Sequence, residues 1–361
     1  MKKFLLSVAM LCMALGGRAE TQEVCQGWPA DYGGVMLQGF WWDSYEATKW
    51  STLTARADEL SQYFDLIWIP NSGTCSGDPN ATTQPKSNGY DPCYWLTHNS
   101  IYGTEEELRT MINTYKAKNV GIIEDVVINH KKGVTNWCDF AQETVTGQNT
   151  NKVYSIAWDN ENYSQICQSD ECNDNGYHTT GANDTGTDFN GYRDLDHTNA
   201  TTRANVKVYL DFLLHELGYA GFRYDMVKGY GAGYIQEYNN DAMPTYSVGE
   251  FWDNQTNIQN WIMGTGNTSA AFDFPLKFKM NEAISNGDYS AFEFKSFTFD
   301  NLCPFLFHLL ACKMYQKIRN KEYGIIGILT DIYYHYGSVL LCYNTVKCKG
   351  YRYPLVLFMP P

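Results

Sequence analysis

Short apolar runs that alternate with helical segments constrain the fold of this chain most strongly. The six runs fall at residues 33–42, 65–70, 121–130, 220–226, 246–251 and 270–276. Between them, residues 103–119 contain a threonine followed by three glutamates, which is typical of a capped helix. Strands that alternate with helices indicate a parallel sheet covered by helices. A doubly wound open sheet and a closed (β/α)8 barrel both satisfy this pattern.

Polar residues gather at the C-terminal ends of three of these strands. Asn129 and His130 end the third strand, Asp225 and Lys228 follow the fourth, and Glu250 ends the fifth. A barrel places its chemistry at this end of its strands. No glycine-rich phosphate-binding fingerprint follows an early strand, which argues against a dinucleotide-binding open sheet. The sequence therefore predicts an α/β protein of the (β/α)8, or TIM-barrel, class.

The composition changes along the chain. Residues 131–199 are rich in Asn, Asp, Gly and Thr and weakly periodic, so we interpret them as a domain inserted after strand three. Residues 20–130 and 200–300 then form the barrel. Residues 301–361 carry seven Lys and Arg against two Asp and Glu, in a chain whose net charge is −13. This atypical tail lacks the pattern of further barrel units, so we expect a barrel incomplete at strands seven and eight.

Two hypotheses account for the tail. It is either an out-of-frame translation that replaces strand seven from near residue 300, or a genuine segment with a separate role. Residues 323–343 are long enough to cross a membrane, but Asp331 and His335 near the middle make a span costly, so none is expected.

The first 19 residues have the pattern of a secretory signal peptide. Two lysines precede an apolar run, and small residues follow, with cleavage expected after Ala19. The run is too short for a membrane anchor. We therefore expect a secreted or periplasmic protein, in which disulfides can form. Six cysteines lie between residues 20 and 300, and their connectivity cannot be deduced from the sequence.

The composition also limits the partners. The net charge of −13 argues against nucleic acid, because little here would neutralise phosphates. Aromatic residues make up 15% of the chain, which suits carbohydrate surfaces but equally suits a large aromatic core. We expect a monomer.

Four charged residues are expected to converge at the barrel mouth. Arg223 and Asp225 lie two residues apart and so share one face of their strand. Asp125 lies in the third strand and Glu250 at the end of the fifth, one on each side of this strand in the chain. The alternative is a buried ion-pair network that only stabilises the barrel.

The expected protonation states differ between two of these acids. The guanidinium of Arg223 should lower the pKa of Asp225 and keep it ionised, as a nucleophile requires. Glu250 stands among apolar neighbours, which should keep it protonated, as a general acid requires. Two such carboxyl groups are the equipment for glycoside hydrolysis, and a separation of about 5–5.5 Å would give retention of configuration.

Four motifs resemble the α-amylases of glycoside hydrolase family 13. They are DVVINH at residues 125–130, RDLDH at 193–197, GFRYDMVKG at 221–229 and VGEFW at 248–252. The resemblance covers roughly residues 33–290, and the C-terminal 60 or so residues do not match. It implies retaining endo-hydrolysis of α-1,4-glucosidic bonds in starch or glycogen.

The resemblance also implies roles for individual residues. Asp225 would be the nucleophile, Glu250 the general acid/base, and Arg223 would orient Asp225. Substrate contacts are expected from Tyr90, Asp125, His130, Lys228 and Trp252. Of these, His130 would hydrogen-bond the sugar at the cleavage point, Tyr90 would stack on it, and Lys228 would contact the neighbouring sugar.

A structural Ca²⁺ is implied by the same resemblance. Its ligands would be Asn129, Asp194 and the backbone carbonyl of Gly229. Oxygen ligands of these types suit this hard cation. The alternative is that Asn129 and Asp194 only cap loops.

One part of the family pattern is missing. The family places a third carboxylate at the end of strand seven, in an Asn-His-Asp motif, and residues 285–361 contain no such motif. Residues 297–301, FTFDN, lack the His-Asp end, so the role does not transfer to Asp300. Two further readings therefore remain open: a catalytically impaired sugar-binding homologue, or an α-glucan transglycosylase.

Overall fold

Six parallel strands form the centre of the computed structural model, which describes residues 25–29, 32–168, 170–286, 340–343 and 355–358. They are β1 (Val35–Gln38), β2 (Leu66–Ile69), β3 (Gly121–Val126), β8 (Gly221–Tyr224), β9 (Tyr246–Gly249) and β10 (Ala270–Ala271). Each pairs in parallel with the next in this order. The six predicted strands are therefore all present, and they form a six-strand parallel half-barrel.

Two further strands extend the sheet on the other side of β1. β11 (Leu340–Tyr343) pairs antiparallel with β1, and β12 (Leu355–Phe358) pairs antiparallel with β11. The rest of the predicted tail, including most of residues 323–343, lies outside the described residues, and so does Asp300. In the part that the structure describes, no helix is long and apolar enough to span a bilayer.

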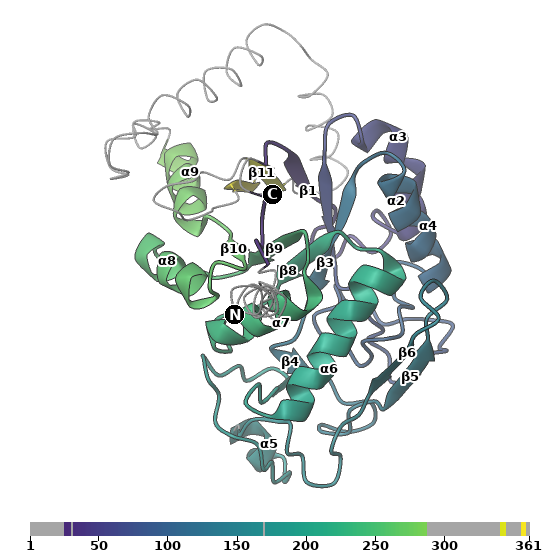
Figure 1. Cartoon of the computed structure of the whole chain (residues 1–361), viewed down its shortest axis with the longest axis vertical. Helices are drawn as coiled ribbons and strands as arrows, with labels where there is room; N and C mark the ends of the chain where they lie inside the picture. Colours follow the sequence, from purple (N-terminus) through teal and green to yellow (C-terminus); the bar gives the residue numbers. More distant parts are fainter. Residues whose placement is uncertain (1–24, 30–31, 169, 287–339, 344–354, 359–361) are drawn as a thin grey trace, which may run out of the picture.

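Helices cover the outer face of the sheet (Figure 1). They are α2 (Trp50–Ala55), α3 (Ala57–Leu60), α4 (Glu105–Lys116), α6 (Ala200–Asp211), α7 (Ala232–Ala242), α8 (Gln255–Gly264) and α9 (Phe274–Asn286). The capping box predicted for α4 is confirmed, because Thr104 accepts from the Glu107 N–H and Glu107 bonds back to Thr104. After α6 the chain continues as a π-helix, η1 (Phe212–Leu217), and ends at Gly218, whose φ of 88° suits glycine.

Residues 131–199 contain little regular structure. A two-residue strand, β4 (His130–Lys131), pairs with β7 (Arg193–Asp194), and β5 (Glu143–Thr146) pairs with β6 (Val153–Ile156). A short helix, α5 (Asp170–Asp174), lies between β6 and β7 in the sequence. The β4–β7 pairing brings the start and the end of this excursion together beside the end of β3.

The aromatic residues divide between the core and the surface. Trp50 and Trp95 are completely buried and belong to the core, whereas Trp42 and Trp252 are 70% and 41% exposed. The large aromatic core therefore accounts for many of these rings, but not for the exposed pair.

Candidate active site

The strand order places the predicted acids side by side. β8 lies between β3 and β9, and Asp125 of β3 is directly opposite Arg223 of β8. Asp225 and Glu250 each stand one residue beyond the end of their strand, at the same edge of the sheet. The sequence motifs thus meet because three consecutive parallel strands end together.

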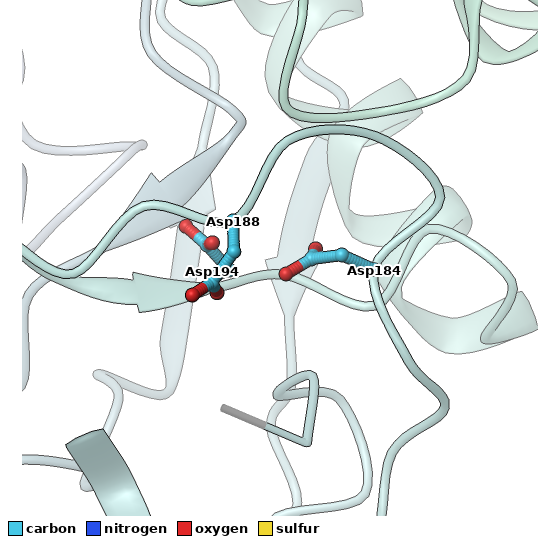
Figure 2. A group of neighbouring side chains, drawn as sticks. All are labelled: Asp184, Asp188 and Asp194. Atoms are coloured by element: carbon cyan, nitrogen blue, oxygen red, sulfur yellow. The ribbon is translucent and has the colours of Figure 1, made fainter. Parts of the chain in front are cut away.

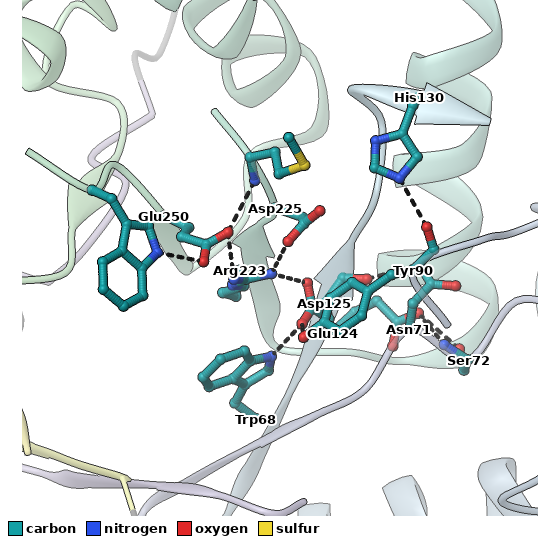
Figure 3. A network of polar contacts seen from close by, with 12 residues as sticks. Trp68, Asn71, Ser72, Tyr90, Glu124, Asp125, His130, Arg223, Asp225 and Glu250 are labelled. Carbon is teal, nitrogen blue, oxygen red and sulfur yellow. Dashed lines mark hydrogen bonds and ion pairs between the residues drawn. The ribbon is translucent and has the colours of Figure 1, made fainter. Parts of the chain in front are cut away.

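The guanidinium of Arg223 binds all three carboxylates (Figure 3). Its Nη1 lies 2.5 Å from Oδ1 of Asp125 and 2.6 Å from Oδ1 of Asp225, and its Nη2 lies 2.7 Å from Oε2 of Glu250. The Arg223 side chain is only 4% exposed, and its guanidinium carbon lies 4.9 Å from the ring centroid of Trp68. The predicted convergence of these four residues is what the structure shows.

Burial sets the ionisation of the two aspartates. Burial raises the pKa of Asp125 to about 6, although the Arg223 guanidinium opposes this shift. Burial also raises the pKa of Asp225 well above its usual range; the Arg223 guanidinium opposes this shift, and the charges of Glu250 and Asp125 add to it. One cation cannot hold three buried carboxylates ionised, so the cluster retains a proton near neutral pH.

Glu250 behaves in the opposite way. Burial opposes its ionisation, but the Arg223 guanidinium and two hydrogen bonds lower its pKa. Oε1 accepts from the indole N–H of Trp252 at 2.7 Å, and Oε2 accepts from the backbone N–H of Met226 at 3.2 Å. The proton of the cluster therefore resides on the aspartates rather than on Glu250.

This order reverses the expected protonation states of Asp225 and Glu250. The sequence predicts an ion pair between Arg223 and Asp225 only, but in the structure a second guanidinium nitrogen of Arg223 also binds Glu250. The sequence also suggests that Trp252 is only an apolar neighbour of Glu250, but the indole N–H of Trp252 donates a hydrogen bond to the Glu250 carboxylate. The prediction was wrong because spacing along a strand does not reveal which N–H groups reach each oxygen.

Met226 holds an unusual backbone conformation beside this cluster. Its φ is 45°, in the left-handed region that non-glycine residues rarely adopt. This conformation accompanies the bond from its N–H to Glu250. Strained residues of this kind concentrate at functional sites.

Asp125 is also held by the predicted residue Tyr90 and by two residues that the sequence analysis did not predict, Trp68 and Asn71. The indole N–H of Trp68 and the hydroxyl of Tyr90 both donate to its Oδ2, at 3.1 and 3.2 Å. The Asn71 amide donates to its backbone carbonyl at 2.7 Å. Trp68 and Asn71 stand at the C-terminal end of β2, so the strand-end rule applied to β3, β8 and β9 could have found them.

Tyr90 and His130 lie together at the rim of the cluster. A ring nitrogen of His130, Nε2, lies 2.8 Å from the carbonyl oxygen of Tyr90, and its ring packs against Tyr192. Burial lowers the pKa of His130 to about 4, so the ring is neutral at neutral pH. The exposed ring of Trp42 is stacked on Tyr90 with centroids 6.2 Å apart, a neighbour that the sequence did not reveal.

Lys228 and Trp252 lie on the Glu250 side. The Lys228 ammonium contacts Asp253 at 2.7 Å and the carbonyl of Trp252 at 3.0 Å. The Trp252 ring stacks on Phe274 with centroids 4.1 Å apart. Both predicted substrate residues thus belong to the surface next to the acid cluster.

A second acidic group lies at the β4–β7 pairing. Asp184, Asp188 and Asp194 place carboxylate oxygens within 4.8 Å of one another, and Figure 2 shows the three side chains converging. Burial and the charges of the other two raise the pKa of Asp194 to about 9. Asp184 and Asp188 were not predicted as ligands, although their spacing before Asp194 in an Asp-rich loop was visible.

Two of the predicted calcium ligands, Asn129 and Asp194, are in contact at the same place, and Gly229 packs against Asn129. The Asn129 amide donates to Oδ1 of Asp194 at 3.0 Å, while its own Oδ1 is buried without a hydrogen-bond partner. A Cβ on Gly229 would lie 1.7 Å from that oxygen, so only glycine fits against it. An orphaned amide oxygen beside converging carboxylates fits a hard cation such as Ca²⁺.

Comparison with known proteins agrees with this geometry. Residues 78–335 match the family described as "Alpha amylase, catalytic domain". The chain therefore belongs to the alpha-amylase family, glycoside hydrolase family 13. The match begins and ends later than the interval 33–290 that carries the motifs, and residues 336–361 lie outside it.

Relatives from plants and bacteria share this similarity. The chain is 30% identical over 271 residues to "Probable alpha-amylase 2" of Arabidopsis thaliana, covering 71% of this chain and 59% of that protein. It is 23% identical to "Alpha-amylase" of Bacillus licheniformis, covering 72% and 58%. A solved alpha-amylase from Malbranchea cinnamomea gives a TM-score of 0.46 at 19% identity, over 66% of this chain and 47% of that one. The chain thus spans less than two thirds of the length of these relatives.

Proposed function

We propose that this chain hydrolyses internal α-1,4-glucosidic bonds of starch- or glycogen-type glucans with retention of configuration. One observation carries the proposal. Oxygens of Asp225 and Glu250 bind neighbouring nitrogens of one guanidinium, at 2.6 and 2.7 Å, so two carboxyl groups face a common space at the mouth of the sheet. Family membership supplies the substrate class.

The proposed reaction uses two carboxyl groups in different states. Asp225 attacks the anomeric carbon while Glu250 protonates the glycosidic oxygen, and water later releases the glycosyl intermediate with Glu250 as base. In the sugar-free protein the proton lies on the Asp225 side. Both carboxyl groups are bound to the guanidinium of Arg223, so the proton has only a short distance to move to Glu250 when a glycosidic oxygen approaches.

The substrate contacts follow from the same arrangement. Tyr90 and Trp42 offer ring faces for a sugar, and neutral His130 offers a hydrogen bond near the cleavage point. Lys228 and Trp252 would contact the sugar on the leaving side of the bond. Arg223 and Asp125 position the acids.

Calcium is the metal we propose for the second acidic group. Asn129, Asp194 and the carbonyl of Gly229 would hold it, with Asp184 and Asp188 completing the oxygen set. Bound there, the ion would supply charge neutralisation and would tie the excursion of residues 131–199 to the end of β3.

The fold and location of the whole protein are also proposals. We propose that the six parallel strands are the first six of a (β/α)8 barrel, and that residues 1–19 direct export. The order of the six parallel strands supports the barrel. The two lysines and the apolar run at the start of the chain support export.

Asp225→Asn tests the proposed reaction. The variant should bind soluble starch but release no reducing sugar, because an amide cannot attack the anomeric carbon. Asp58→Asn changes an exposed aspartate and serves as the matched control, with unchanged activity expected. Hydrolysis by Asp225→Asn at the rate of the control would exclude Asp225 as the nucleophile.

A second candidate is glucan binding without hydrolysis. The missing Asn-His-Asp motif favours it, because losing a group that acts only in the transition state lowers kcat without weakening affinity. Starch pulldown combined with a reducing-sugar assay on the unmodified chain separates the two. Binding with sugar release supports hydrolysis, and binding alone supports the second candidate.

A further inference from the structure

Two buried cysteines meet within the excursion of residues 131–199. The sulfur atoms of Cys138 and Cys172 lie 3.8 Å apart, and both residues are completely buried. Cys138 follows β4, and Cys172 lies in α5, 34 residues later in the sequence. A disulfide requires about 2.05 Å between sulfurs, so bond formation needs an approach of only roughly 1.8 Å.

The surrounding contacts hold both cysteines in place without such a bond. The Cys138 N–H donates to the Asn136 side chain at 2.8 Å, and the carbonyl of Cys172 accepts from the Tyr177 N–H at 2.9 Å. Next to Cys138, the Trp137 ring packs against the Arg193 guanidinium of β7, 4.1 Å from its centroid. The sulfurs are therefore kept together by packing that comes from both ends of the excursion.

We propose that Cys138 and Cys172 form a disulfide that closes this excursion. Two thiols and one molecule of glutathione disulfide give the protein disulfide and two molecules of glutathione, so the electrons of the thiols pass to the glutathione sulfurs and the two protons go with them. Because both sulfurs are buried in the folded chain, the exchange takes place before the excursion has packed. The bond closes a loop of residues 138–172, and Asp184 and Asp194 follow this loop in the chain.

Peptide mapping of the full chain tests this pairing. The reduced, unfolded chain is refolded with glutathione and glutathione disulfide, alkylated under denaturing conditions without reduction, and cut with trypsin and Asp-N. Cleavage after Lys132 and before Asp139 and Asp170 separates Cys172 from Cys167. The expected product joins residues 133–138 to residues 170–173, two hydrogen atoms lighter than the separate peptides.

Cys167 provides the internal control in the same digest. Its thiol lies beside Asp184 rather than at this pair, so we expect it to be alkylated. Alkylation of both Cys138 and Cys172 in the soluble monomer, or linkage of either to another cysteine, would overturn the proposal.

Variants add an independent measurement. The double variant Cys138→Ser with Cys172→Ser should melt several degrees below the unmodified chain refolded without reductant, and at the same temperature as that chain refolded and kept in reductant. Cys25→Ser, which removes a buried thiol that contacts the carbonyl of Pro244, should show a shift that reductant does not change. A reductant-independent shift in the double variant counts against the bond.

Discussion

Replacing Arg223 by methionine tests the electrostatics of the cluster most directly. Methionine keeps much of the apolar stem but leaves Asp125, Asp225 and Glu250 without their shared cation. One unit charge attracts another by about 4 kcal/mol at 4 Å and an effective dielectric constant of 20. With one carboxyl protonated, Arg223→Met removes two such attractions and leaves the repulsion between the two carboxylates, so the loss is at most about 8 kcal/mol.

Removing one partner of a buried pair typically costs about 3–5 kcal/mol, which is less than this upper bound because the remaining carboxyls take up protons. We therefore expect Arg223→Met to lower the free energy of unfolding by about 3–5 kcal/mol at neutral pH. Without the cation, the pKa values of Asp125 and Asp225 rise further, and the pKa of Glu250 is no longer held low. The penalty should then shrink towards about pH 4, where protonated carboxyls need no counter-charge.

Urea denaturation followed by tryptophan fluorescence measures this difference at both pH values. Arg56→Met removes a surface arginine paired with Glu59 and is the matched control, with an expected change below about 1 kcal/mol at either pH. An equal loss of stability for Arg223→Met at both pH values would refute the electrostatic account, because lost packing does not depend on protonation.

Three further measurements follow from individual contacts. Trp252→Phe keeps the ring but removes the N–H bonded to Glu250, so the pKa of Glu250 should rise, and the alkaline limb of kcat/KM should move to higher pH. Asn129→Ala removes the orphaned oxygen and should weaken Ca²⁺ retention about 10–100-fold in a chelator titration followed by melting temperature. Glu124→Gln should abolish a pH dependence of stability. Burial raises the pKa of Glu124 to about 8, above its unfolded value, so the unmodified chain loses stability as pH rises towards 8, whereas the amide does not titrate.

The fold could be predicted well because its signals are local. Apolar runs marked all six strands, and Thr104 with Glu107 marked the start of α4. The convergence of Asp125, Arg223 and Glu250 followed from alternation along strands and from the common ends of parallel strands.

What could not be predicted depends on contacts between distant segments. The bond from Trp68 to Asp125 joins residues 57 apart, and the acidic group brings Asp184 to Asp194 through an irregular loop. No periodicity encodes such pairs. The protonation order failed for the same reason, because it depends on N–H groups supplied by Trp252 and Met226 rather than on residue spacing.

The strand order also explains why the shared arginine belongs to β8. Neighbouring strands lie about 4.7–4.9 Å apart, so a side chain on the middle of three strands reaches both neighbours. From β8, Arg223 contacts Asp125 on β3 and Glu250 after β9. An arginine at the position of Asp125 would stand two strands, or roughly 9–10 Å, from Glu250 and could not bind it while also binding Asp225. The shared arginine therefore has to stand on β8, the middle strand of the three, close to Asp225 in the sequence. A double variant that exchanges Asp125 and Arg223 conserves the charge but should not form the cluster.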